Sequence, residues 1–485
     1  MKIYTYIKKL TCIFLMTILF VSMVSAVPLD IDGDDLDPLV DIEVTVEIQQ
    51  IRAFDKDDKQ FGLLPCYPIF FKREYIDKKS DPDFYVKVLI NNEESTSDTW
   101  HDTKYIYDPQ FSATVDVPDD EEFVTVKIQL WDWNNNVDVL CDIGDENDDV
   151  EITYSIKTGH WTGDDQLDDP SGYGRLNGCD DRSIYRRDRD CELWFNIYQN
   201  DYDGDGIPYW TEVNDYGTDP EVNNLGDDSD NDDIPIEWEW KWGYDPFVWD
   251  DHAELDPEGD SIDNFEEYLT SEWFSDPFRK DVFVELDIMD EGPNGEKSYF
   301  PENSGEIIQT AFDRQNIVFH LDYGSMGGHD IIPFDEMVRR GELHEIYYDF
   351  FLHGDENNWR RGVFHYGVVV YRSTSAAGYI FRANAFQISS FGHENIASEK
   401  FWADKDTVFG SAYMHELGHT FDFDPIPGHN PSLGLFEHLM NRPYKSCMNY
   451  GYTYYTVDYS DGTRMSPDLD DWSRMDLTYF EREWG

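Results

Sequence analysis

The stretch His415 to His429 reads HELGHTFDFDPIPGH, and it decides how the rest of the chain is interpreted. Apolar residues recur at helical spacing before it, so the sequence predicts a helix that includes His415 and His419. In a helix these two residues, four apart, project from the same face. Two imidazoles presented in this way can share one zinc ion, and Glu416 beside them can act as a general base toward water. The pattern therefore predicts a zinc-dependent hydrolytic site.

A second motif, Ser446-Cys447-Met448-Asn449-Tyr450, follows further along the chain. This motif resembles the Met-turn that follows the HExxH helix in the metzincin zinc metalloproteases. Its form, Ser-x-Met-x-Tyr, is similar to that of the astacin- and serralysin-like branches. In that family a methionine packs beneath the metal, and a tyrosine two residues later approaches it. The resemblance implies that Met448 is the floor of the site. It also implies that Tyr450 is a metal ligand or stabilises the oxyanion.

The chain departs from the family pattern at two positions. The pattern HExxHxxGxxH would place glycine at position 422 and histidine at position 425, where this sequence has Asp422 and Pro425. Aspartate tolerates the left-handed backbone that ends such a helix, so Asp422 is an acceptable substitute for glycine. Proline cannot bind zinc, so the third ligand has to come from another residue.

Three residues are candidates for the third zinc ligand. Asp424 is adjacent in sequence to Pro425, which limits how its carboxylate turns inward. Glu437 would be the ligand in a gluzincin-type site, but the Met-turn speaks against that class. His429 follows Pro427-Gly428, a dipeptide that makes a turn and can bring the imidazole back under the helix. Imidazole is also the commoner third ligand where a Met-turn follows, so we favour His429.

The first 26 residues have the composition of a secretory signal peptide. Lysines precede an apolar run from Leu10 to Val24, and Val24-Ser25-Ala26 offers small residues for cleavage. The run is short for a membrane span. We expect residues 1–26 to be removed and the mature protein to be secreted, or to be held at the cell surface by contacts.

Length and charge limit the class of protein further. The 485 residues are enough for three domains. With 102 acidic and 37 basic residues the formal net charge is −65, which argues against nucleic acid as a partner. An aromatic content of 16% argues against a disordered acidic chain. The negative charge must then lie on a folded surface, be neutralised by bound calcium, or be screened by a salty medium.

Residues 27–198 are predicted to form an all-β domain. Apolar and polar residues alternate in Val44–Ile48, and Tyr85–Ile90 and Phe123–Trp133 are similar alternating or apolar runs. Turn-rich polar stretches separate these runs. This arrangement favours an antiparallel sandwich.

Two stretches of this domain, Lys79–Val88 and Leu130–Asn134 with the Asp142-Ile143-Gly144 that follows, resemble the C-two domain. That family is a sandwich that binds phospholipid in a calcium-dependent way through acidic loop residues at one end. The resemblance implies contact with a membrane or cell surface, although a calcium-free structural sandwich stays open as an alternative. The residues at matching places are Asp81, Asp132 and Asn134, with Asp55 or Asp58 in the first loop.

Residues 199–278 contain three acidic loops in register. Each has oxygen-bearing side chains at positions 1, 3, 5 and 12, the spacing of an EF-hand-type calcium loop, and the first loop has glycine at position 6. Asp233 and Ser261 replace that glycine in the other two loops. The units resemble thrombospondin-type calcium repeats, and the alternative is a solvated acidic linker. The expected calcium ligands are Asp201, Asp203, Asp205, Ile207 (through its carbonyl) and Glu212; Asp228, Asp230, Asp232 and Glu239; and Asp256, Glu258, Asp260 and Glu267.

Residues 279–485 are predicted to form an α/β (α+β) metzincin-like peptidase domain. In that family an edge strand binds extended substrate by β-addition. The predicted elements are a buried strand at 281–287, a helix at 302–315, a strand at 316–321, a helix at 335–351, a buried strand at 363–371, an exposed edge strand at 383–389 and a terminal helix at 468–483.

These patterns together predict a secreted, calcium-stabilised zinc endopeptidase in which Glu416 is the general base. The alternative from another class is a calcium-dependent surface-adhesion protein whose zinc fold is vestigial. The intact Glu416 favours the enzyme, because a structural zinc site needs ligands but no base.

Overall fold

The structure is a computed structural model of the chain. It describes residues 36–54, 76, 80–144, 147–165, 174–179, 189–374, 376–399, 404–430 and 439–479. The described residues all belong to one compact unit, which begins at Leu36. The predicted signal peptide (1–26), Asp55, Asp58 and Glu437 lie outside the described residues. Within the described part of the chain, no helix has the length and apolar character needed to cross a bilayer.

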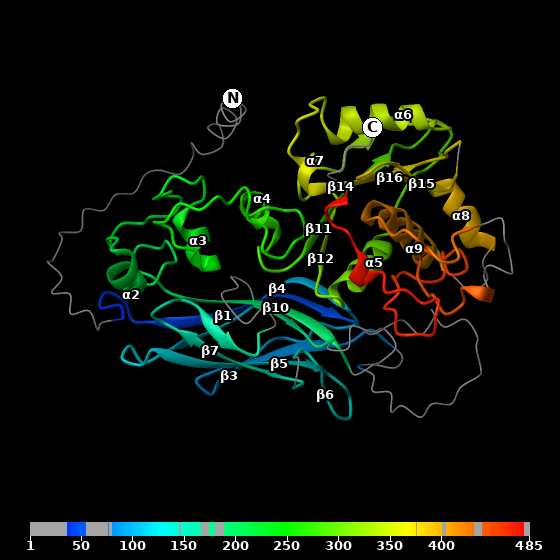
Figure 1. Cartoon of the computed structure of the whole chain (residues 1–485). Coiled ribbons are helices and arrows are strands. Elements are labelled where there is room, and N and C mark those ends of the chain that lie inside the picture. Colours follow the sequence, from blue (N-terminus) through cyan, green and yellow to red (C-terminus); the bar gives the residue numbers. More distant parts are fainter. Residues whose placement is uncertain are drawn as a thin grey trace. The chain divides into compact units, whose positions relative to one another are not determined.

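The N-terminal region is a β-sandwich of two antiparallel sheets (Figure 1). The alternate residues Phe84, Val86 and Val88 are fully buried, and they share one core with Val44 and Val46 of the other sheet. The predicted alternation is thus confirmed. One sheet has the order β4 (Tyr105–Asp116), β1 (Glu43–Ala53), β10 (Cys191–Gln199), β9 (Gly174–Asn177). The other has the order β3 (Glu93–Thr96), β2 (Phe84–Ile90), β5 (Phe123–Asp132), β7 (Val150–Ser155), β8 (Trp161–Gly163), with β6 (Val139–Leu140) paired to β5.

The repeat region consists of loops joined by short helices. Buried Ile234, Trp238 and Trp242 form a small core of their own, against which Tyr244 and Phe265 pack. Because so few apolar side chains are available, this region depends on its polar loops for order. Its helical elements are α2 (Tyr209–Thr211), the π-turn η3 (Glu212–Tyr216), α3 (Ile236–Trp242), α4 (Asn264–Thr270) and the 3₁₀ turn η4 (Ser271–Trp273).

The C-terminal region is built around a mostly parallel sheet (Figure 1). The strand order is β12 (Val318–Asp322), β11 (Asp281–Met289), β14 (Phe364–Val370), β16 (Ala385–Ser389), β15 (Gly378–Arg382), with β13 (Ile331–Ile332) paired to β11. Only β15 runs antiparallel to its neighbour.

Helices cover both faces of this sheet. Val284 and Leu286 of β11 share a core with α5 (Glu302–Asp313) and α9 (Lys405–Gly418). Phe283 and Met289, which point the other way, share a second core with α6 (Arg340–Ile346) and the π-turn η5 (Tyr347–Phe351). The strand is buried on both sides, which explains why its apolar residues are not confined to alternate positions. The remaining helices are α7 (Arg360–Val363) and α8 (Ser390–Glu399).

Three predicted elements of this region need correction. The segment 383–389 is not an exposed edge: β16 is fully buried and lies between β14 and β15, so the edge strand is β15. The prediction was wrong because it took polar residues as a sign of exposure. Ser389 is buried instead, and its hydroxyl donates a hydrogen bond to the carbonyl oxygen of Tyr371 (2.9 Å). The predicted helix at 468–483 is, as far as residue 479, not an α-helix: the segment has a 3₁₀ turn at Trp472–Arg474 (η8), and 3₁₀ structure appears again at residue 479. The predicted helix at 335–351 begins five residues late, at Arg340.

Candidate functional site

The helix α9 presents the HExxH residues. The carboxylate of Asp404 caps its first turn by accepting a hydrogen bond from the backbone N–H of Thr407 (2.8 Å). The helix is almost wholly buried from Thr407 to Gly418 and passes into a 3₁₀ turn, η6 (His419–Phe421). Asp422 ends the turn in the left-handed conformation expected of it, with φ 56°. The chain can therefore reverse direction immediately after His419.

This reversal brings together the three predicted histidines. One ring nitrogen from each of His415, His419 and His429 lies within 4.8 Å of the others. Nε2 of His429 is 3.3 Å from Nε2 of His415. On its other side, Nδ1 of His415 lies 2.8 Å from the carbonyl oxygen of Cys447, to which it donates its hydrogen. That hydrogen bond leaves the Nε2 lone pair of His415 directed at the other two rings.

Burial keeps these imidazoles in the form that can bind a metal. It lowers the pKa of His415 well below its usual value and that of His419 to about 4, and the neighbouring histidines add to both effects. Burial also lowers the pKa of His429. Neutral imidazoles have a lone pair to donate, and three of them that converge can hold a divalent ion such as zinc.

Glu416 lies beside this cluster and against the edge strand. Its side chain is nearly buried, and burial raises its pKa to about 8. The carboxylate lies so close to Gly378 of β15 that a β-carbon on Gly378 would be 2.3 Å from Oε1. A carboxyl group in such surroundings binds a proton more readily than one in water, which suits a general base.

Met448 and Tyr450 both lie close to the end of α9 and the histidine cluster. Met448 is fully buried beneath the end of α9, where a β-carbon on Gly418 would lie 2.5 Å from its sulfur. The ring of Tyr450 stacks on His429, with centroids 4.2 Å apart, and lies 5.6 Å from the ring of His415. Tyr450 is half-exposed.

His429 and Asp424, the two candidates for the third zinc ligand among the described residues, lie in different surroundings. Asp424 is exposed, and its backbone N–H donates to the carbonyl oxygen of Asp422 (2.7 Å). His429 instead lies in the turn that follows Pro427-Gly428, and the Gly428 carbonyl accepts a hydrogen bond from the backbone N–H of Tyr450 (3.2 Å). The segment Ser446–Tyr450 therefore holds the turn that carries His429.

The three acidic loops share one backbone conformation. Position 6 has a positive φ in each, 89° at Gly206, 77° at Asp233 and 77° at Ser261. The aspartate at position 1 accepts a hydrogen bond from the N–H of position 6 in every loop, at 3.1 Å, 3.2 Å and 3.1 Å in chain order. Asp233 and Ser261 thus adopt a conformation that favours glycine, which costs each about 1 kcal/mol.

The glutamates at position 12 of the loops are buried without enough hydrogen-bond donors. Burial raises the pKa of Glu212 to about 8 and of Glu239 to about 7, and raises that of Glu267 well above its usual value. Neither carboxylate oxygen of Glu239 or of Glu267 accepts a hydrogen bond. A buried carboxylate without a partner is costly, so the loops have the donor set and the charge to hold a cation.

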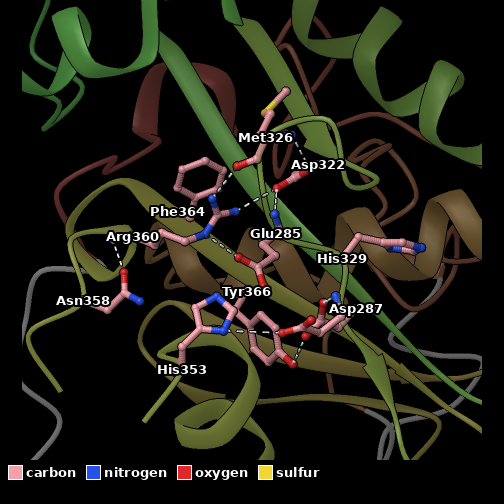
Figure 2. Close-up of polar contacts among 12 residues, drawn as sticks. Glu285, Asp287, Asp322, Met326, His329, His353, Asn358, Arg360, Phe364 and Tyr366 are labelled. Atoms are coloured by element: carbon pink, nitrogen blue, oxygen red, sulfur yellow. Dashed lines mark hydrogen bonds and ion pairs between the residues drawn. The ribbon is translucent and has the colours of Figure 1, made fainter. Parts of the chain in front are cut away.

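Sequence reasoning missed a buried network of charges in the α/β region. Figure 2 shows Arg360 between Glu285 and Asp322, at N–O distances of 2.6 Å and 2.8 Å. Nearby, the hydroxyl of Tyr366 donates to Asp287 (2.8 Å). Charged residues at 285 and 287 inside an apolar strand were the available signal. Because Asp322 also accepts from backbone N–H groups of the following loop, we assign this network a structural role.

The acidic residues at the end of the sandwich are used within the protein. Asp132 is buried; one carboxylate oxygen accepts from the backbone N–H of Asp83 (2.9 Å) and the other from Asn134 Nδ2 (2.7 Å). Asp81 is paired with Lys104 at 3.7 Å. These contacts give no support to a calcium site formed by the described residues there.

Comparison with protein-family models gives no match, and comparison with curated proteins gives none either. Among solved structures, the chain is similar to human GIVD cytosolic phospholipase A2 (13% identity, 33% of this chain and 17% of that chain, TM-score 0.19). It is also similar to a C2 domain (11% identity, 33% and 98%, TM-score 0.19) and to a pair of C2 domains of extended-synaptotagmin 2 (12%, 38% and 47%, TM-score 0.19). The chain thus spans only a small part of the phospholipase, and the sandwich assignment rests on the strand pairing above.

Proposed function

We propose that the protein is a secreted, calcium-stabilised zinc endopeptidase. The observation that carries the proposal is the convergence of His415, His419 and His429, with Glu416 on the same helix. Three neutral nitrogen donors fit a catalytic zinc ion, which takes three protein ligands and keeps one position open. His415 is oriented by a backbone carbonyl, which is the kind of support that zinc-binding histidines need.

The protein side chains would act on the substrate in distinct ways. When bound, zinc supplies a positive charge that polarises a peptide carbonyl and lowers the pKa of water toward about 7. Glu416 accepts the proton of the attacking water and returns it to the leaving amine. The hydroxyl of Tyr450, next to the histidines, donates a hydrogen bond to the oxygen on which negative charge develops. Met448 supports the site from below and takes no part in proton transfer.

The edge strand supports a polypeptide substrate. β15 is the last strand in the described sheet, and Gly378 at its start touches Glu416. An extended peptide that pairs with β15 would therefore pass directly over the general base. The missing side chain at Gly378 lets the Glu416 carboxylate lie directly against the edge strand. The proposed reaction is hydrolysis of a peptide bond within an extended segment.

Calcium would stabilise the repeat region. The carboxylates of the first and third loops converge within 4.8 Å in the groups Asp201, Asp203 and Asp205, and Asp256, Glu258 and Asp260. Calcium binds to oxygen ligands of this kind, and it would offset the repulsion between them.

The test is cleavage of casein or gelatin by the purified chain, compared with Glu416→Ala. The variant should keep its zinc, measured by elemental analysis, and lose about 100-fold or more of its activity, because a general base is removed and no ligand is lost. A zinc chelator should abolish the activity of the wild type, and added zinc should restore it. Equal activity of variant and wild type would rule out this mechanism.

A second candidate function is attachment to a surface through the sandwich. The loop between β5 and β6 exposes Trp133 (40%) and Val137 (75%). Apolar side chains at a loop tip can insert into a lipid interface. Co-sedimentation with phosphatidylcholine vesicles, with and without calcium, tests this candidate. Binding should fall in Trp133→Ala/Val137→Ala, and binding unchanged by both substitutions would exclude this loop.

A further inference from the structure

The second acidic loop contains a nitrogen donor. His252 is 1% exposed, and its Nε2 lies 3.2 Å from Oδ2 of Asp232 and 3.8 Å from Oε1 of Glu239. One ligand atom from each of the three residues lies within 4.8 Å of the others. Each of the three loops also has a group of this kind that consists of carboxylates alone, and at the second loop it is Asp228, Asp230 and Asp232. His252 therefore changes the chemistry of the second loop.

Two of the three groups in this cluster, Glu239 and His252, lack hydrogen bonds at the atoms that face it, whereas Oδ2 of Asp232 accepts one from the backbone N–H of Asp250 (3.3 Å). Glu239 is fully buried, and neither of its oxygens accepts one. Nε2 of His252 is buried and makes none either. A buried carboxylate and a buried imidazole nitrogen that point into the same small space are what a bound cation would satisfy.

The ring of His252 is held from its other side. Nδ1 lies 3.1 Å from the side-chain amide of buried Asn264, whose Oδ1 is otherwise without a donor. The two ends of an amide exchange by rotation, and with Oδ1 toward the ring it accepts the Nδ1 hydrogen. Nε2 then directs its lone pair at the carboxylates. The rings of Trp238 and Tyr244 pack edge-on against the imidazole, with centroids 5.8 Å and 5.0 Å away.

We propose that Asp232, Glu239 and His252 bind a divalent transition metal ion of the zinc type, in preference to a calcium ion held by Asp228, Asp230, Asp232 and Glu239. Calcium prefers sites made of oxygen alone, whereas one imidazole with two carboxylates suits zinc, cobalt or nickel. The ion would tie the second loop and α3 to the segment that leads into the third loop. This site is independent of the proposed peptidase centre.

The experiment measures zinc in the full chain after dialysis against trace zinc and excess calcium, so that all-oxygen sites hold calcium. The wild type should keep about two zinc ions per chain, and His252→Asn and His429→Ala about one each. The double variant should keep none. Asparagine preserves the contact to Asn264 and removes the nitrogen that faces the carboxylates. If His252→Asn loses zinc and His429→Ala does not, the result would support this site and show that the peptidase centre holds no zinc.

Glu239→Gln provides a second variant in case His252→Asn does not fold, which calcium-dependent melting curves show. It should lose the same zinc ion, because the amide has a similar shape and no charge. Cobalt in place of zinc gives a further readout, since its visible absorption should lose one component in His252→Asn. Equal zinc content in the wild type, His252→Asn and Glu239→Gln would overturn the proposal and leave His252 as a hydrogen-bonding or charge-pairing residue of a calcium loop.

Discussion

Gly378 of β15 and Glu416 of α9 are in direct contact, so close that a β-carbon on Gly378 would lie 2.3 Å from the Oε1 atom of Glu416. Gly378 has no positive φ, so its backbone conformation is open to any residue. The restriction on this position is the space taken by the carboxylate. A single methyl group added at Gly378 would therefore displace the carboxylate of Glu416, and the substitution shows whether activity depends on the position of that carboxylate.

Gly378→Ala should reduce proteolysis by about 10-fold or more while zinc content stays unchanged, because the methyl group displaces the base and leaves the histidines in place. Casein cleavage and elemental analysis measure the two effects. Gly341→Ala is the matched control, because a β-carbon there meets nothing within 4 Å. If Gly378→Ala keeps full activity, the carboxylate acts from a different position or is not the base.

Substitution of the proposed third ligand should release the metal. His429→Ala should weaken zinc binding by about 10-fold or more, because two histidines alone hold zinc poorly. Asp424→Ala should keep the ion of the peptidase centre, since that carboxylate is exposed. Equilibrium dialysis followed by elemental analysis distinguishes them. A zinc-free Asp424→Ala beside a zinc-replete His429→Ala would reverse the assignment.

Calcium should stabilise the repeat region through the first and third loops. Its addition at low salt should raise the melting temperature and suppress proteolytic cleavage between residues 200 and 277. Asp201→Ala should lose much of this protection, because Asp201 also organises the loop by accepting from the N–H groups of Gly204 and Gly206. Asp215→Ala removes a similar exposed charge outside the ligand positions and should behave as wild type. A melting temperature indifferent to calcium would identify the loops as an acidic linker.

His393 should make the fold sensitive to acid. It is 1% exposed, and burial lowers its pKa from 6.5 to about 4. Between these pH values the unfolded chain binds the proton and the folded chain does not. The free energy of unfolding should therefore fall by up to about 3 kcal/mol as the pH drops from 6.5 to about 4.

Urea denaturation across this pH range measures the effect of His393. His393→Asn can still donate to the carbonyl oxygen of Ser389, which now accepts from the histidine at 2.8 Å, but asparagine does not titrate. The difference between wild type and variant removes the contribution of the many carboxylates. Parallel pH profiles would show that His393 has no part in acid sensitivity.

Local spacing in the sequence was enough to predict several features. The four-residue separation of His415 and His419 places them on the same side at the end of α9, where His419 is the residue at which the helix passes into η6. Asp422 adopts a left-handed backbone because its own side chain tolerates it. Alternation in β2 and the apolar run in β11 likewise report which faces are buried. Each of these depends on interactions within a few residues.

Contacts between distant residues were decided only by the tertiary structure. The approach of His429 to His415 depends on how the backbone of Tyr450 holds Gly428. The edge strand is β15 because β16 pairs on both sides, and polar Gln387 and Ser389 find partners inside the fold. Arg360 meets Glu285 and Asp322, and His252 meets Glu239, only after the chain has folded back. Periodicity shows which side of an element is buried, but a polar residue's partner depends on long-range packing, which spacing along the sequence does not encode.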